Sequence, residues 1–309
     1  MASYNQTWFS IVGFRTTLPL QLCAFSALLL VYIFSLLANM LTITIIMLHQ
    51  HLQTPMYFFL RNLAILDICL SSSTVPKLLY IFVSGDESIS FGGCIFQLYF
   101  YVSVGSAAFY NLALLSIDRY IAICHPLRYN TLLPIPRCRK LVAFAWVFGF
   151  LEFIPLVIVI SQLDWCSSNV AIDHFFCDGS TLLRLSCSDT ALVENLFFGL
   201  ASFTILGSFL PTFSSYCSII ATVLRVSSST GRRRMFSTCS SHFIAVSINY
   251  GCCIFIYVRQ AGKNSTTHEK TVAIFNSILG PLVQPLIYTL RNQAVLKGLK
   301  KTIAPYLNI

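Results

Sequence analysis

An acidic and a basic side chain stand next to each other where a long apolar stretch meets a basic part of the chain. The stretch Leu115–Tyr129 contains the triplet Asp118, Arg119 and Tyr120. A charge at the edge of a hydrocarbon layer is unfavourable unless it is paired. Adjacent opposite charges there favour a switch that is closed when the two are paired and open when they separate. Taken alone, the triplet could equally be a static ion pair at an interface.

No arrangement of residues in the chain is typical of catalysis. We find no glycine-rich phosphate loop, no HExxH pair, no nucleophile elbow and no pair of carboxylates that one cavity would hold. The acids well inside apolar segments are Asp67 and Glu152. A transporter would be expected to show inverted repeats or several buried ionisable groups, and we find no repeat. We therefore expect neither an enzyme nor a cofactor, and a seven-helix transporter or channel remains as an alternative class.

The composition of the chain predicts membrane-spanning helices, and the triplet would lie at the end of one of them. Of 309 residues, 56% are hydrophobic and 10% are charged, and the mean hydropathy is +0.74, which indicates a membrane protein. Seven apolar windows are long enough to cross about 30 Å of hydrocarbon. They are residues 22–48, 57–83, 94–124, 140–161, 194–225, 236–259 and 270–291. The predicted fold is an all-α membrane protein, a seven-transmembrane helix bundle at 22–291 between an extracellular tail at 1–21 and a cytoplasmic segment at 292–309.

Lysine and arginine are concentrated in three of the predicted connections, which the positive-inside rule places in the cytosol. They are Arg128, Arg137, Arg139 and Lys140; Arg225, Arg232, Arg233 and Arg234; and Arg291, Lys297, Lys300 and Lys301. We expect a multi-pass plasma-membrane protein with an extracellular N-terminus and no cleaved signal peptide. Asn5, in the sequon Asn5–Thr7, is then a glycosylation site. The net charge of +9 indicates attraction to lipid headgroups and a docking surface, and not nucleic-acid binding.

Apolar and basic residues alternate at helical spacing after the last predicted span. Val295, Leu296, Leu299 and Ile303 fall opposite Lys297, Lys300 and Lys301. This pattern predicts a short amphipathic helix at 293–303 on the inner leaflet.

Four of the 12 cysteines fall on the predicted extracellular side, where disulfides persist. They are Cys94, Cys166, Cys177 and Cys187. Three pairings are possible; we favour Cys94 with Cys177, which would pin the long loop over the bundle, and Cys166 with Cys187, which would fold that loop on itself. A zinc site formed by Cys166, His174, Cys177 and Cys187 is the alternative, but the spacing fits no common cluster, so we expect no metal.

Asp67 lies in the middle of the second predicted span, where an ionisable group is by default functional or paired inside the bundle. We expect Asn39 and polar groups of the seventh span to be its partners. Pro155, Pro211, Pro281 and Pro285 predict bends in spans four, five and seven.

Four sequence strings resemble those of the vertebrate olfactory receptors, within the rhodopsin-like G-protein-coupled receptors. They are Thr54–Leu60, Asp118–Tyr129, Phe236–His242 and Pro285–Asn292, in order along the whole chain. The loop Asp173–Asp178, followed by Leu185–Thr190, is similar to the class II (tetrapod) branch.

The resemblance implies an odorant receptor on olfactory cilia that activates a heterotrimeric, stimulatory olfactory G protein and raises cyclic AMP. A non-olfactory chemosensory receptor of the same fold is the alternative. Asp118 and Arg119 would form an inner lock, and Tyr216 and Tyr288 would swing inward on activation. By the same resemblance Ser237 to His242 would begin the mobile sixth helix, and Pro285 would belong to the switch. Ala108 and Gln284 replace residues that the family often has, so a sodium site at Asp67 is not implied.

Residues three and four apart share a helix face, and this spacing predicts a ligand pocket. The candidates are Val102, Gly105, Ser106 and Phe109; Leu200, Ala201 and Thr204; Tyr250, Cys253, Ile254 and Tyr257; and Ser277. Each could instead be an ordinary packing position. Together they predict an apolar, aromatic cavity with a few hydroxyls and no ionisable side chain, which favours a small, volatile, neutral and hydrophobic ligand.

Overall fold

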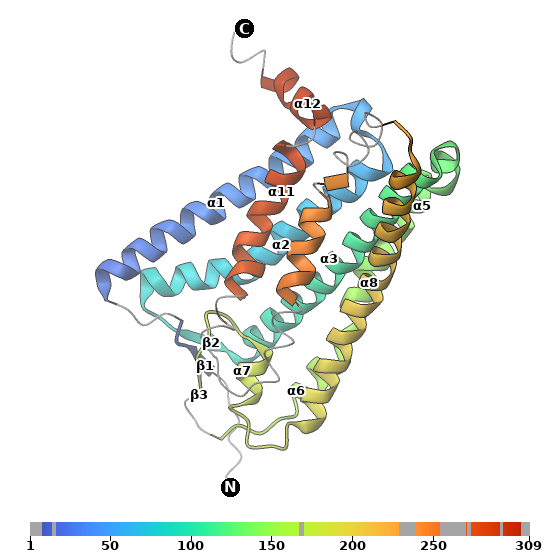
Figure 1. Ribbon diagram of the computed structural model, residues 1–309. Coiled ribbons are helices and arrows are strands. Elements are labelled where there is room, and N and C mark those ends of the chain that lie inside the picture. Colours follow the sequence, from blue (N-terminus) through green and yellow to red (C-terminus); the bar gives the residue numbers. More distant parts are fainter. Residues whose placement is uncertain are drawn as a thin grey trace.

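The computed structural model describes residues 8–13, 17–166, 170–228, 239–240, 242–253, 270, 273–290 and 293–303. Within this part of the chain, five spans are long and apolar enough to cross a membrane. They are α1 (Leu18–Leu48), α2 (Pro55–Ser84), α3 (Phe91–Cys124), α5 with α6 (Ile135–Glu152 and Ile154–Ile160) and α8 (Ala191–Arg225). Helical residues 242–253 and 273–290 occupy the sixth and seventh predicted spans, and all of these helices pack into one elongated bundle (Figure 1).

The long helices begin before the apolar windows that predicted them. Helix α1 begins at Leu18 and not at residue 22, and α3 begins at Phe91 and not at residue 94. Proline in the first turn, as in α1, or a polar residue just before the helix, as in α3, favours these earlier starts but lowers the hydropathy. At α3, for example, the Ser90 hydroxyl accepts a hydrogen bond from the Gly93 amide at 3.1 Å.

Proline interrupts the helices at some of the predicted positions and not at others. The fourth span is divided at Phe153, two residues before Pro155, into α5 and α6. The Tyr99 hydroxyl donates a hydrogen bond to the Phe150 carbonyl at 2.9 Å and so satisfies a backbone group near this break. The seventh span contains a π-helical turn, η3 (Phe275–Leu279), followed by α11 (Gly280–Leu290), and Pro281 lies at this junction. Helix α8, in contrast, is continuous through Pro211.

A small sheet covers the end of the bundle where α3 begins (Figure 1). Strand β1 (Trp8–Ile11) pairs antiparallel with β2 (Ser88–Ser90) and parallel with β3 (Val170–Ile172). Phe9 and Ile11 of β1 are buried. Within the predicted tail at 1–21, residues 8–11 thus form a strand, which a stretch of four residues was too short to predict. Asn5 lies outside the described residues.

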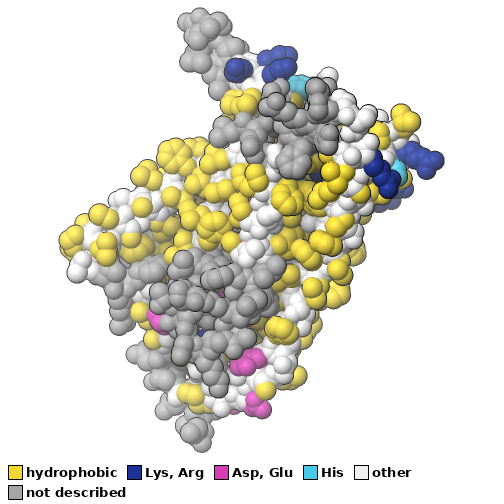
Figure 2. All heavy atoms as spheres, in the orientation of Figure 1, with side chains coloured by type: hydrophobic (Ala, Val, Ile, Leu, Met, Phe, Trp, Pro, Cys, Tyr) yellow, Lys and Arg dark blue, Asp and Glu magenta, His cyan; other side chains and the backbone are white. Residues whose placement is uncertain are grey.

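The opposite end of the bundle carries short helices and most of the basic side chains. These helices are η1 (Gln50–Leu52), η2 (Pro126–Arg128), α4 (Tyr129–Leu132) and α12 (Gln293–Ile303). Lys and Arg gather at this end, and acidic side chains are visible at the other (Figure 2). Helix α12 has the bounds that its amphipathic pattern predicted, and the His49 ring at the end of α1 contacts its Gly298 carbonyl at 3.0 Å.

Candidate functional site

A cavity of about 220 Å³ lies inside the bundle. Helices α2, α3 and α8 form its walls together with the sixth and seventh spans. The loop between α6 and α8 closes the end of the cavity near the start of α3 through His174, Phe176, Asp178 and Ser180. The predicted pocket residues that line it are Val102, Gly105, Ser106, Phe109, Ala201, Thr204 and Cys253.

Three other predicted pocket residues lie elsewhere. The Tyr250 ring is buried between Phe109 and Phe209, with its centroid 5.3 Å from each of theirs. Ser277 is buried and donates a hydrogen bond to the Ala273 carbonyl at 2.6 Å, and Leu200 packs against an apolar cluster near α6. Helical spacing identifies the residues that share a helix face, but it does not predict which of them line the cavity and which pack against a neighbouring helix. Ile254 and Tyr257 lie outside the described residues.

Ionisable side chains belong to the cavity wall, and the expectation that none would was wrong. They are Asp67 from α2 and His174 and Asp178 from the covering loop. Asp178 caps α7 (Gly179–Leu183): its Oδ2 atom accepts hydrogen bonds from the Ser180 hydroxyl at 2.5 Å and the Thr181 amide at 3.1 Å. Burial holds the pKa of His174 below its ordinary value, so its ring is neutral at neutral pH. The pocket prediction used residue spacing on helix faces only, so it included no residue of this loop.

Two disulfides and an ion pair hold the loop over the cavity. Cys94, near the start of α3, is bonded to Cys177, and Cys166 is bonded to Cys187. These are the favoured pairings, and they use all three cysteines of the alternative zinc site. The Gln97 side-chain oxygen accepts a hydrogen bond from the Cys177 amide at 3.0 Å. Lys270 in turn forms an ion pair with Asp173 at 2.6 Å.

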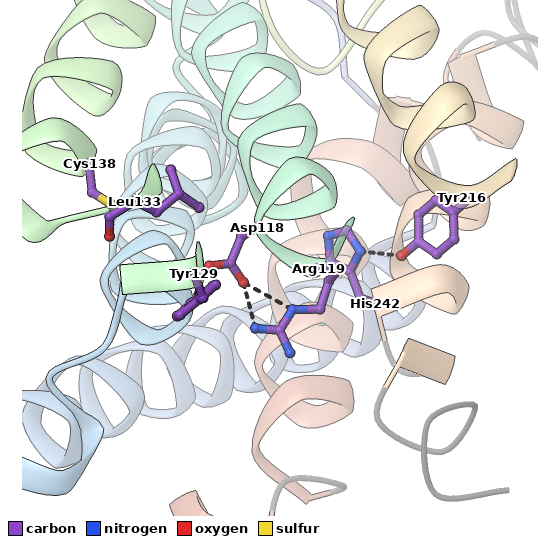
Figure 3. A network of polar contacts seen from close by, with 7 residues as sticks. All are labelled: Asp118, Arg119, Tyr129, Leu133, Cys138, Tyr216 and His242. Carbon is purple, nitrogen blue, oxygen red and sulfur yellow. Dashed lines mark hydrogen bonds and ion pairs between the residues drawn. The ribbon is translucent and has the colours of Figure 1, made fainter. Parts of the chain in front are cut away.

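Near the C-terminal end of α3, the Asp118 carboxylate is bound by two partners (Figure 3). Its Oδ2 atom accepts a hydrogen bond from Arg119 Nε at 3.0 Å, and its Oδ1 atom accepts one from the Tyr129 hydroxyl at 2.6 Å. Asp118 is 0% exposed and Arg119 is 8% exposed. Burial, followed by the Asp118 charge, raises the pKa of Tyr129 above its ordinary value, so this phenol remains a donor. Tyr120 instead hydrogen-bonds His125 at 3.0 Å, away from the pair.

Tyr216 and His242 form a second contact beside this ion pair. The Tyr216 hydroxyl is hydrogen-bonded to His242 Nδ1, and the two rings stack with centroids 5.8 Å apart. The Tyr288 ring lies 6.1 Å from that of His242, and Pro285 lies within α11 one helical turn earlier. Figure 3 shows Arg119 between Asp118 and the His242–Tyr216 pair. Ser237 lies outside the described residues.

The polar side chains in the middle of the bundle are not paired as expected. The Asn39 side-chain amide donates hydrogen bonds to the backbone carbonyls of Ser35 and Pro281, at 2.9 and 2.8 Å, and not to Asp67. Asn39 therefore ties α1 to the seventh span, while Asp67 faces the cavity. Asn39 does not bond Asp67 because the Pro281 carbonyl is available as an acceptor for its amide. Side-chain types alone do not indicate which backbone carbonyls are available.

Glu152 also belongs to the site, although helical spacing did not predict it. It ends α5 and accepts hydrogen bonds from Ser106, Tyr110 and Thr204 at 2.8, 3.0 and 2.7 Å. Ser106 and Thr204 line the cavity. An acid well inside an apolar span was the available signal, but its partners are on other helices.

A bundle of membrane helices with an internal cavity under a disulfide-anchored loop, and a buried ion pair at its basic end, defines the class of rhodopsin-like G-protein-coupled receptors. The chain belongs to the olfactory receptor family of that class, whose family model matches residues 28–305. The fold is therefore a seven-helix bundle, and the protein is a membrane receptor and not an enzyme.

Relatives of known family align with almost the whole chain. Human olfactory receptor 2AP1 is 41% identical, over 98% of this chain and 98% of its own length. Human olfactory receptor 6C76 is 44% identical, over 96% and 95%. Mouse olfactory receptor 6E1 is 42% identical, over 98% and 97%.

Proposed function

We propose that this receptor binds small, neutral, hydrophobic odorants in the cavity and activates a stimulatory olfactory G protein, which raises cyclic AMP. The observation that carries the proposal is the position of α3, which lines the cavity at Val102 and Gly105 and holds the Asp118–Arg119 pair at its cytoplasmic end. One rigid element thus joins the proposed ligand site to the proposed switch.

The cavity favours neutral ligands although three ionisable residues line it. Two of them, the neutral ring of His174 and the hydrogen-bonded carboxylate of Asp178, close its extracellular end. The third is the single carboxyl group of Asp67 on α2. Most of the other lining side chains are apolar or aromatic. The volume of about 220 Å³ is below the range of about 300–1,000 Å³ that is usual for drug-sized ligands. Small hydrophobic molecules therefore fit it best.

The sixth span provides the second connection between the two sites. Its Tyr250 ring contacts Phe109 beside the cavity, and its His242 ring is bonded to Tyr216 near Arg119. A ligand that favours a different position of this span would shift the population of receptors in which the His242–Tyr216 contact and the Arg119–Asp118 pair are open. Arg119 would then be free to bind the G protein.

The basic end of the bundle faces the cytosol in this proposal, with α12 on the inner leaflet and the N-terminus extracellular. The receptor would lie in the plasma membrane of olfactory cilia. The Lys and Arg side chains at this end would provide the surface for the G protein (Figure 2).

Filling the cavity tests where the ligand binds. A Cβ atom added at either Gly105 or Gly199 has no neighbour within 4 Å, but only Gly105 is among the cavity residues. We expect Gly105→Val to raise the odorant concentration needed for half-maximal cyclic AMP by about tenfold or more, roughly 1.4 kcal/mol of binding, while Gly199→Val leaves it unchanged. Equal responses of the two variants, at matched surface expression, would place the ligand elsewhere.

A further inference from the structure

The Glu152 carboxylate is surrounded by hydroxyl groups from two other helices. Ser106 and Tyr110 of α3 donate hydrogen bonds to Oε2 at 2.8 and 3.0 Å, and Thr204 of α8 donates one to Oε1 at 2.7 Å. A negative charge is unfavourable at the C-terminal end of a helix such as α5. Three hydroxyl donors compensate an ionised carboxylate there, because that group can only accept hydrogen bonds.

These bonds determine which hydrogen-bonding atoms face the cavity. A serine or threonine hydroxyl has one proton to donate and lone pairs that accept. Ser106 and Thr204 both line the cavity and both direct their protons to Glu152. Their oxygens lie 3.3 Å apart, and neither has a second proton to give to the other. This part of the wall therefore presents acceptors and no hydroxyl donors.

We propose that Glu152 is a positioning residue that sets ligand specificity, because it makes the Ser106–Thr204 wall accept hydrogen bonds from a ligand. The receptor then selects alcohols or phenols over ketones, aldehydes, esters and ethers of the same carbon skeleton. The inference rests on the proposed function and names the ligand class for the same cavity.

A carbonyl or ether oxygen at this wall would face lone pairs on both hydroxyl oxygens. It would lose its hydrogen bonds to water and gain none from Ser106 or Thr204. An alcohol instead donates its own proton to them. Sites built around a hydrogen bond to a ligand hydroxyl discriminate strongly against analogues that lack it.

A matched ligand series tests this selectivity in the unmodified receptor. Each carbon skeleton is supplied as the alcohol, the ketone or aldehyde, and the methyl ether, and cyclic AMP is measured over a range of concentrations. We expect alcohols to be about tenfold more potent, the discrimination given by one hydrogen bond. Equal or greater potency of the carbonyl compounds overturns the inference and leaves the proposed function standing. Silence over the whole series in a surface-expressed receptor overturns both.

Glu152→Gln tests the role of the carboxylate. The amide of glutamine can donate a hydrogen bond to one wall hydroxyl, and that hydroxyl can then direct its proton into the cavity. We expect the ratio of alcohol to ketone potency to fall by about tenfold. Tyr110→Phe is the matched control, since it removes a donor to Glu152 from outside the cavity lining and should leave the ratio unchanged. An equal loss of both potencies in Glu152→Gln would indicate a purely structural role and overturn the inference.

Thr204 provides a test that does not depend on the folding of the Glu152 variant. Thr204→Ser keeps the hydroxyl, and Thr204→Val replaces it with a methyl group of similar size. We expect the alcohol preference to persist in the serine variant and to decrease by about tenfold in the valine variant. The same preference in both variants would overturn the inference.

Discussion

At the residue scale, the proposed switch has one more hydrogen bond than its adjacent charges suggest. The Asp118 carboxylate uses one oxygen for Arg119 and the other for Tyr129. Tyr129 belongs to the short helix α4 after α3, so this bond joins α3 to the segment that follows it. Both donors stabilise Asp118 as a buried anion, and the closed arrangement needs both.

Removing the second donor should therefore raise basal activity. A hydrogen bond to a charged group contributes about 1.5–3 kcal/mol, so Tyr129→Phe should increase ligand-free cyclic AMP severalfold at matched surface expression. Tyr120→Phe is the control, because the Tyr120 hydroxyl contacts His125 and not Asp118. An unchanged basal level in Tyr129→Phe would contradict the role of this bond.

His174 should make the loop over the cavity sensitive to acid. Burial lowers the pKa of its ring; Asp178 and Asp173 oppose this shift and Lys270 adds to it. Above the ordinary pKa of about 6.5, the ring is neutral in the folded and the unfolded chain, and stability does not depend on it. Below that value the unfolded chain binds a proton that the folded chain does not, so the free energy of unfolding decreases as the pH falls.

The acid sensitivity of His174 is tested by measuring the melting temperature of the purified receptor as a function of pH. Between about pH 7 and about pH 5, where histidine normally titrates, the wild type should lose stability more steeply than His174→Phe. Phenylalanine can keep the ring contacts that His174 makes with Phe175 and Phe176. Parallel curves for the two proteins would exclude His174 as the source of the acid sensitivity.

At the element scale, α3 and α5 approach each other closely at Gly149. A Cβ atom there would lie 2.9 Å from the Ala107 backbone nitrogen and 2.9 Å from the Ser103 carbonyl oxygen. Backbone atoms within a helix cannot move aside individually, so the two helices would have to separate. Glu152 follows on the same helix, and its bonds to α3 depend on this approach.

Gly149→Ala should consequently destabilise the receptor. We expect a loss of about 1–3 kcal/mol, typical of overpacking, measured as a lower melting temperature in detergent. Gly199→Ala should keep or raise the melting temperature, because its Cβ meets no atom within 4 Å and alanine favours helix formation. Similar melting temperatures for the two variants would show that α3 and α5 can separate without loss.

Hydropathy predicted that the long helices exist, but it did not predict their ends or the cover over the cavity. Apolar windows miss first turns of low hydropathy such as Phe91–Cys94, which Ser90 caps. Strand β1 depends on partners from two distant segments, and pairings of that kind leave no local pattern. The break near Pro155 was predictable because proline removes a helix hydrogen bond, whereas continuity through Pro211 was not.

Helical spacing placed one face of α3 and part of α8 at the cavity, where Gly105, Ser106 and Thr204 come together. It failed for Tyr250 because neighbouring aromatic rings fill that direction. Glu152 was missed because its role depends on hydroxyls from two other helices. Periodicity in one sequence predicts the face of a single helix, but it does not predict which residues of different helices are in contact.

At the scale of the whole molecule, the receptor is polarised along the bundle. The acidic end carries the sheet, and the basic end carries α12 (Figures 1 and 2). The disulfide-anchored loop lies at the start of α3, and the Asp118–Arg119 pair lies near its other end. The cavity lies between these ends, next to the helices that reach both. We propose that ligand binding in the cavity opens the ion pair and activates a G protein.

The role of Arg119 in activation is tested by measuring odorant-evoked cyclic AMP in the wild type and in Arg119→Ala. Both receptors are expressed with an olfactory stimulatory G-protein subunit and at equal surface levels. A panel of small neutral odorants should evoke a response in the wild type, and the arginine variant should lose it because the guanidinium that binds the G protein is gone. Responses of equal size in the two receptors would show that Arg119 is not needed to activate the G protein.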